Sequence, residues 1–164
     1  MRILRYQGKL LRARSRQVAG NTDYGAKFVQ MCVSNICGPH PFRLQSKAKF
    51  NSGNFDKPAN DAIESGWKAW GKPGVCDYEQ RISWADMQRL VCRILPTDGE
   101  VLLRIVQGSK AKPWGLQLQV LDVDRLDEDK NETLPGGNVI IAGVELDPDG
   151  RTVAYHLLKR KPKD

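Results

Sequence analysis

Residues 83–105, "SWADMQRLVCRILPTDGEVLLRI", contain a change of hydrophobic period that decides the fold class. Ser83 and Asp86 have the spacing of a helix capping box, and the next apolar residues recur at helical spacing: Met87, Leu90, Val91 and Ile94. We therefore predict a capped helix that ends near Leu95. Segment 101–106 then has a period of two, with Val101, Leu103 and Ile105 on one face and the residues between them on the other. This pattern predicts a strand directly after the helix.

Two segments upstream also have apolar residues at helical spacing. "DYGAKFVQMCVSNICGP", which starts at Asp23, predicts an amphipathic helix ended by its Gly-Pro pair, with an apolar stripe of Tyr24, Phe28, Met31, Cys32 and Ile36. A second helix is expected to begin at Asp56, whose carboxylate can accept hydrogen bonds from free backbone amides. Its apolar face would contain Ile63, Trp67 and Trp70.

The remaining segments predict strands and turns. Residues 42–50 are a short candidate strand. In segment 116–120, Leu116, Leu118 and Val120 alternate with two glutamines, which predicts a second strand, joined to strand 101–106 by a loop. In the last segment, "NVIIAGVELDPDGRTVAYHLLKR", the string "DPDG" has the proline and glycine positions of a hairpin turn. One face of this hairpin is expected to contain Ile140, Ala142, Val144 and Leu146. Because helices precede strands, we predict an α+β fold with N-terminal helices packed on a mainly antiparallel sheet that ends in a β-hairpin.

The net charge of +7 comes mainly from the two ends of the chain. Segment 9–21, "KLLRARSRQVAGN", is a candidate helix with arginine over most of its surface, and the last residues are also basic. Positive charge attracts anionic partners, so the side chains that could contact DNA or a partner protein are Arg5, Arg12, Arg14 and Arg16. A solvated or partner-facing terminus and a nucleic-acid groove both fit this charge pattern.

The acidic stretch 118–132, "LQVLDVDRLDEDKNE", resembles a calcium-binding loop at first sight. An EF-hand loop needs glycine at its sixth position and glutamate at its twelfth. A loop started at Asp122 would have Asp127 and Thr133 at these positions. We therefore interpret the stretch as a solvated turn after a strand.

The sequence contains no constellation that indicates catalysis, a metal or a cofactor. His156 has no activated Ser or Cys neighbour in the sequence, and "LPGGN" lacks the lysine of a phosphate loop and reads as a turn. Cys37 and His40 are close enough to share a metal, but a structural zinc site would need two more ligands. The four cysteines lack the spacing of a zinc site, so we expect reduced and mostly buried thiols. No apolar run approaches the roughly 20 residues that cross a bilayer.

Four strings together resemble the lambda-type phage portal protein family. They are "RARSRQVAGNTDYGAKFVQMCVSNICG", "CDYEQRISWADMQRLVCRILPTDGEVLLRI", "LQLQVLDVDRLD" and "GGNVIIAGVELDPDGRTVAYHLL". Their order and spacing are similar to the N-terminal part of that family, and the resemblance covers almost the whole chain. It divides the chain into a basic lead at 1–22, a portal-like α+β domain at 23–158 and a basic end at 159–164, which would be a truncation point.

The resemblance implies a structural, non-enzymatic role. A portal forms a ring at one capsid vertex, usually of twelve copies, through which DNA passes without sequence preference and to which terminase and head-completion proteins attach. The chain would be the wing-like part of such a virion protein, assembled in the host cytoplasm, and the channel-lining helices would lie beyond Asp164. The side chains expected to hold a turn or to pair with a neighbouring subunit are Asp122, Asp124, Arg125 and Asp127. The alternatives are a small independent nucleic-acid-binding protein and, less favoured, a metal-dependent hydrolase or nuclease.

Overall fold

The computed structural model describes residues 2–159, and side chains from residue 8 onward. Four helices come first: α1 (Arg2–Asn21), α2 (Asp23–Ile36), α3 (Lys57–Trp70) and α4 (Trp84–Asp98). The strands follow as β1 (Leu102–Gln107), β2 (Leu116–Leu121), β3 (Glu132–Thr133), β4 (Val139–Ile141), β5 (Val144–Leu146) and β6 (Thr152–Tyr155), with two short 3-10 turns, η1 (Gly108–Lys110) and η2 (Val123–Arg125). Helices before antiparallel strands confirm the predicted α+β class.

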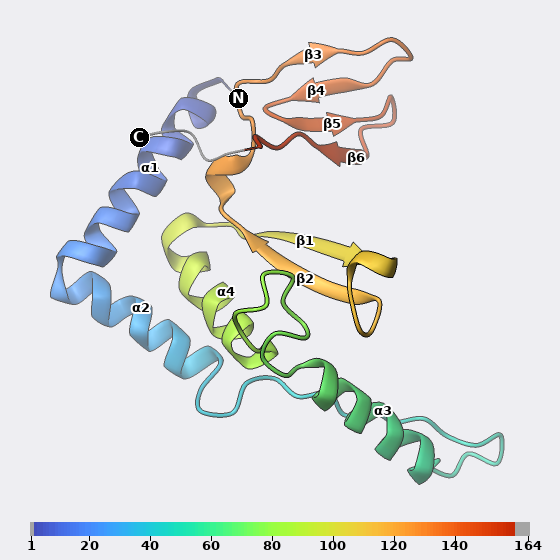
Figure 1. Cartoon of the computed structure of the whole chain (residues 1–164). Helices are drawn as coiled ribbons and strands as arrows, with labels where there is room; N and C mark the ends of the chain where they lie inside the picture. Colours follow the sequence, from blue (N-terminus) through green and yellow to red (C-terminus); the bar gives the residue numbers. More distant parts are fainter. Residues whose placement is uncertain (1, 160–164) are drawn as a thin grey trace.

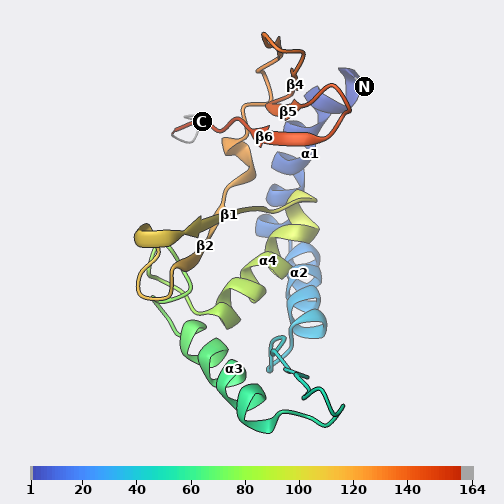
Figure 2. The ribbon, with the colours of Figure 1, turned by 90° about the vertical axis from the view of Figure 1, so that its right-hand side faces the viewer.

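The molecule is elongated, with α3 at one end and strands β3 to β6 at the other (Figures 1 and 2). Helices α1, α2 and α4 contact one another and form the middle layer. The strands form two sheets rather than one: a β1–β2 ribbon beside α4, and a four-stranded sheet of order β3-β4-β5-β6. No helix in the described part of the chain has the length and apolar character needed to cross a membrane.

The capping box predicted for α4 is confirmed. The Ser83 hydroxyl accepts a hydrogen bond from the Asp86 amide at 3.1 Å, and the Asp86 carboxylate accepts one from the Ser83 amide at 3.3 Å. The helix ends at Asp98 instead of Leu95, with Pro96 inside its last turn. The Thr97 hydroxyl donates to the Ile94 carbonyl at 2.9 Å, so one free carbonyl of that turn is satisfied by a side chain.

Four of the five residues of the predicted α2 stripe are exposed, which the sequence pattern did not indicate, and the fifth, Cys32, is half-buried. Tyr24 is 92% exposed, and Phe28, Met31 and Ile36 are each at least half exposed. The helix packs on α4 through a different stripe that contains Val33, with Cys37 as its C-cap residue. Because α2 has apolar residues on two sides, helical spacing alone could not show which side α4 covers.

The strand predicted at 42–50 is wrong. Only Lys49 makes a bridge, an isolated one with Phe55. The backbone of this segment is hydrogen-bonded by side chains of α3 instead: Asn60 bonds both the amide and the carbonyl of Ala48, at 2.7 and 3.1 Å, and the Glu64 carboxylate accepts from the Ser46 amide at 2.9 Å. These groups are therefore satisfied without a neighbouring strand.

The β1–β2 pairing is confirmed, with Leu102 opposite Leu121 and Gln107 opposite Leu116. The final hairpin exists between β5 and β6, where the Asp147 amide donates to the Arg151 carbonyl at 2.9 Å. The continuous strand expected through Ala142 is wrong, because Ala142 and Gly143 form a turn that separates β4 from β5.

Three tryptophans fix α3 against its neighbours. The rings of Trp67 and Trp70 lie 4.8 Å apart, and Trp84 at the start of α4 lies 5.6 Å from Trp70. The Trp70 indole donates to the Leu116 carbonyl at 2.8 Å, which connects α3 to β2. The Asp56 cap predicted for α3 is confirmed by its 3.0 Å bond from the Ala59 amide.

We predict that Gly143→Ala destabilises the protein more than Gly99→Ala. Both glycines have φ of +78°, so alanine at either position adopts a left-handed conformation that disfavours it by about 1–2 kcal/mol. A Cβ at Gly143 would also lie 2.6 Å from the Asp127 carbonyl oxygen, whereas a Cβ at Gly99 meets no atom within 4 Å. Urea unfolding of the two variants measures the contribution of this contact. Equal free energies of unfolding would contradict the close approach of the turn to Asp127.

Candidate functional site

Two arginines of α1 meet a group of carboxylates from two distant parts of the chain. Arg12 and Arg16 are four residues apart and therefore lie on the same side of the helix. Their partners come from the end of α4 and from the segment after β2. We call this group the arginine–carboxylate junction; its members are Arg12, Arg16, Asp98, Glu100, Asp122, Asp124 and Glu128.

Arg12 is the central residue of the junction and is only 7% exposed. Its Nε donates to Asp124 at 3.3 Å, one terminal nitrogen donates to Glu100 at 3.2 Å, and the other donates to Glu128. Burial opposes its charge, but the Glu128 hydrogen bond and the three carboxylate charges together raise the pKa of Arg12 above its usual value. A buried charge of this kind requires partners for all of its donors.

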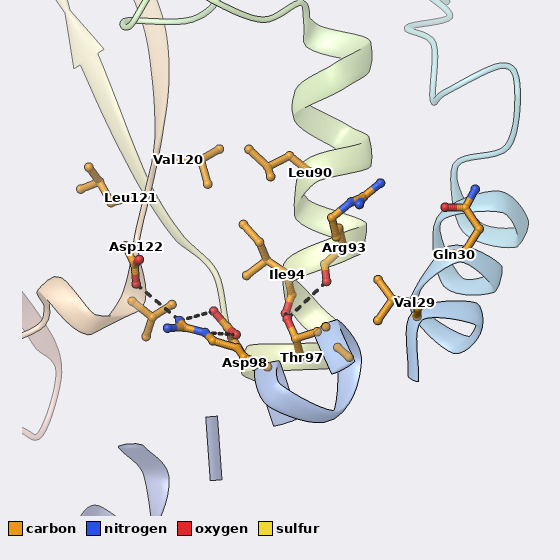
Figure 3. A pocket seen from close by; sticks show the side chains of 15 residues that line it. Val29, Gln30, Leu90, Arg93, Ile94, Thr97, Asp98, Val120, Leu121 and Asp122 are labelled. Atoms are coloured by element: carbon orange, nitrogen blue, oxygen red, sulfur yellow. Dashed lines mark hydrogen bonds and ion pairs between the residues drawn. The ribbon is translucent and has the colours of Figure 1, made fainter. Parts of the chain in front are cut away.

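Arg16 forms a bidentate pair with Asp98, at 2.8 Å from Nε and 2.6 Å from a terminal nitrogen. Its other terminal nitrogen donates to Asp124 at 2.5 Å. The terminal nitrogen that bonds Asp98 also donates to Asp122, at 3.4 Å. The dashed lines at Asp98 and Asp122 in Figure 3 mark these bonds. The hydrogen bond with Asp98 is the largest cause of a raised Arg16 pKa and outweighs the opposing effect of burial.

The predicted residues after β2 connect this junction to the rest of the molecule. Asp122 accepts a hydrogen bond from the Asp124 amide at 3.0 Å and caps η2. Arg125 donates to the Leu158 and Lys159 carbonyls at 3.3 Å. Asp127 contributes its backbone, because its amide donates to the His156 carbonyl at 3.0 Å. The segment thus connects α1 and α4 to the chain that follows β6.

The four arginines singled out in the sequence have different surroundings. Arg12 and Arg16 belong to the junction, Arg14 is exposed, and the Arg5 side chain lies outside the described residues. Five carboxylates face two guanidinium groups in the junction, so it carries an excess of negative charge and does not form a phosphate-binding groove. Contacts of these arginines with DNA or with a partner protein stay a prediction.

Sequence reasoning missed three members of the junction: Asp98, Glu100 and Glu128. The four-residue spacing of Arg12 and Arg16 is a signal that one helix side presents two positive charges to a common partner. No local pattern indicated which of the carboxylates would be that partner, because the paired residues lie 82 to 116 positions apart.

An open cleft of about 750 Å³ adjoins the junction between α1, α2, α4 and β2 (Figure 3). Its walls are mainly apolar and include Val29, Leu90, Ile94 and Val120. Asp98 and Asp122 lie at one side of it (Figure 3), and both accept hydrogen bonds from Arg16, which also lines the cleft. Among residues 2–159, no three His, Cys, Asp or Glu side chains are arranged to hold a metal ion.

Comparison with known proteins identifies a family over nearly the entire chain. The family described as "Phage portal protein, lambda family" matches residues 2–164. The "Probable portal protein" of Halomonas phage phiHAP-1 is 35% identical over 154 residues, which are 94% of this chain. The matched region is 30% of the length of that relative.

Proposed function

The chain belongs to the lambda family of phage portal proteins, and from this premise we propose that it acts as a structural part of a portal. The portal would be a ring at one capsid vertex, usually of twelve copies, through which DNA is packaged and ejected. Terminase, the capsid and head-completion proteins would be its partners, in the virion and in the host cytoplasm during assembly. The family match over residues 2–164 carries this proposal. The chain spans 30% of the length of its relative, so the proposal concerns the contribution of this part to the whole ring.

The large accessible surface of the chain supports an assembly role. It measures 11959 Å², whereas a compact monomer of 18.4 kDa is expected to expose about 8,200 Å². A standard protein interface removes about 800 Å² from each partner. A ring subunit has two neighbours and needs two such interfaces, and the surplus is larger than both together.

We assign one of these interfaces to the exposed side of α2, which we call the α2 stripe: Tyr24, Phe28, Met31 and Ile36. These four large apolar side chains are at least half exposed and share one helix. The helix contains a single lysine and a single aspartate, so the stripe has few charges that would have to lose water on contact. The occupant that we propose is a second copy of the chain.

The alternative of an independent nucleic-acid-binding protein has less support. Arg12 and Arg16, two of the arginines that suggested it, are each bonded to several carboxylates. The remaining positive charge is expected to bind duplex DNA weakly, without sequence preference and with a steep dependence on salt.

The α2 stripe predicts concentration-dependent association of the chain into small oligomers. We expect light scattering to show a mass above that of the monomer at high protein concentration, and Phe28→Ser with Met31→Ser to weaken association about tenfold or more. Leu10→Ser, at an equally exposed apolar position of α1, serves as the matched control. Circular dichroism checks that the variants keep their helices.

Two results would count against the proposals. A wild-type chain that stays monomeric at all concentrations, or a double variant that associates as strongly as the wild type, would rule out the α2 stripe as a contact between copies. Tight binding that distinguishes two unrelated duplexes at physiological salt would favour the nucleic-acid-binding protein over the portal.

A further inference from the structure

We propose that Cys37 and Cys92 form an oxidation site at which hydrogen peroxide, or another small two-electron oxidant, joins the two thiols in a disulfide between α2 and α4. The two sulfur atoms lie 3.1 Å apart, and both side chains are buried, at 4% and 7% exposed. Both cysteines are free thiols. This inference does not depend on the proposed function.

The geometry allows the bond to form with little movement. Sulfur atoms in a disulfide are about 2.0 Å apart, so the two thiols must approach by about 1 Å. Cys37 is the C-cap residue of α2 and is followed by Gly38, which has φ of +62°. The backbone at Cys37 is therefore at the end of its helix, where a small change in dihedral angles disturbs no later turn. Cys92 is held inside α4 and provides the rigid side of the pair.

The chemistry uses the two thiols and one molecule of peroxide. A thiolate sulfur attacks one peroxide oxygen, the O–O bond breaks, and the product is a sulfenic acid with release of hydroxide. The second sulfur then attacks the sulfenic sulfur, the S–S bond forms, the S–O bond breaks and hydroxide leaves and is protonated to water. Over both steps the thiols lose two electrons and two protons, and peroxide becomes two molecules of water.

The surroundings of the pair make this reaction slow. Burial, followed by the hydrogen bond with Cys37, raises the pKa of the Cys92 thiol to about 11. The reactive thiolate is therefore rare near neutral pH, and a reducing compartment would keep the pair reduced. Cys76 is also buried, but its sulfur contacts backbone carbonyls of Lys72 and Ile82 and has no thiol neighbour among the described residues.

The bond would fix the middle layer of the molecule. It would connect residues 55 positions apart and would hold α2 against α4. Both helices line the cleft beside the arginine–carboxylate junction, α2 with Val29 and α4 with Leu90 and Ile94. Oxidation would therefore restrain two of the elements that line that cleft.

The test is treatment of the whole chain with a small excess of hydrogen peroxide, followed by intact mass and peptide mapping without reductant. We expect the loss of two hydrogen atoms, one cross-linked peptide pair that contains Cys37 and Cys92, and reversal by dithiothreitol. The thermal midpoint should rise by about 5–15 °C, because closure of a loop of this length restricts the unfolded chain. Cys76→Ser is the matched control and should keep the cross-link, whereas Cys92→Ala should lose it.

Other outcomes would overturn the proposal. These are oxidation of Cys37 or Cys92 to sulfinic acid without a cross-link, a cross-link that uses Cys32 or Cys76 instead, or a thermal midpoint that falls on oxidation. Mapping of the wild-type chain decides among them even if a cysteine variant fails to fold.

Discussion

Replacement of Arg12 by methionine is expected to lower the free energy of unfolding by about 3–5 kcal/mol, because it removes the charge that three carboxylates share. Methionine fills a similar volume but leaves Asp124, Glu100 and Glu128 without their common donor. Glu128 is the most affected of them, since its side chain is only 13% exposed. Water can therefore replace little of the lost interaction.

Urea unfolding of Arg12→Met measures this effect, with Arg14→Met as the matched control. Arg14 is on the same helix, is exposed, and has no ion pair within the described part of the chain, so its replacement should change stability by less than about 0.5 kcal/mol. The double variant Arg12→Met with Glu128→Gln should lose less stability than the sum of the single variants, because the two residues interact directly. Equal losses for Arg12→Met and Arg14→Met would show that the junction does not stabilise the fold.

Replacement of Trp70 by alanine is expected to lower the free energy of unfolding by about 3–5 kcal/mol. Trp70 is 5% exposed and contacts the rings of both Trp67 and Trp84, which also contact each other. Its removal leaves a cavity in that cluster and also leaves the Leu116 carbonyl without the indole donor. The expected result is a loosened α3, since the tryptophan cluster is its main connection to α4 and β2.

Thermal unfolding followed by circular dichroism tests this prediction, and Trp114→Ala is the matched control. Trp114 is 53% exposed, so its loss should change the midpoint only slightly. For a chain of this size the loss at Trp70 corresponds to a midpoint about 6–20 °C lower. A midpoint for Trp70→Ala equal to that for Trp114→Ala would contradict the placement of α3 on β2.

Several of the structural features that the sequence predicted correctly depend on contacts within a few residues. The Asp56 cap, the Ser83 and Asp86 capping box and the turn after Asp147 all form between groups three or four positions apart. The family could also be identified from the order of four strings. The strand predicted at 42–50 is absent because Asn60 and Glu64 of α3 hydrogen-bond its backbone. These side chains lie 12 and 18 positions from the residues that they bond, so local spacing could not indicate the contacts.

The sequence by itself determined the capped helices, the paired strands and which arginines and aspartates to consider, because these depend on local spacing and residue type. Only the tertiary structure decided that Arg12 and Arg16 would meet Asp98, Asp122 and Asp124, and that the α2 stripe would stay uncovered. The physical reason is the same in both cases. A charged side chain requires a partner of opposite charge, and an apolar side chain requires apolar surroundings. Many residues of the chain could provide either, so the packing of the whole chain determines which of them become neighbours.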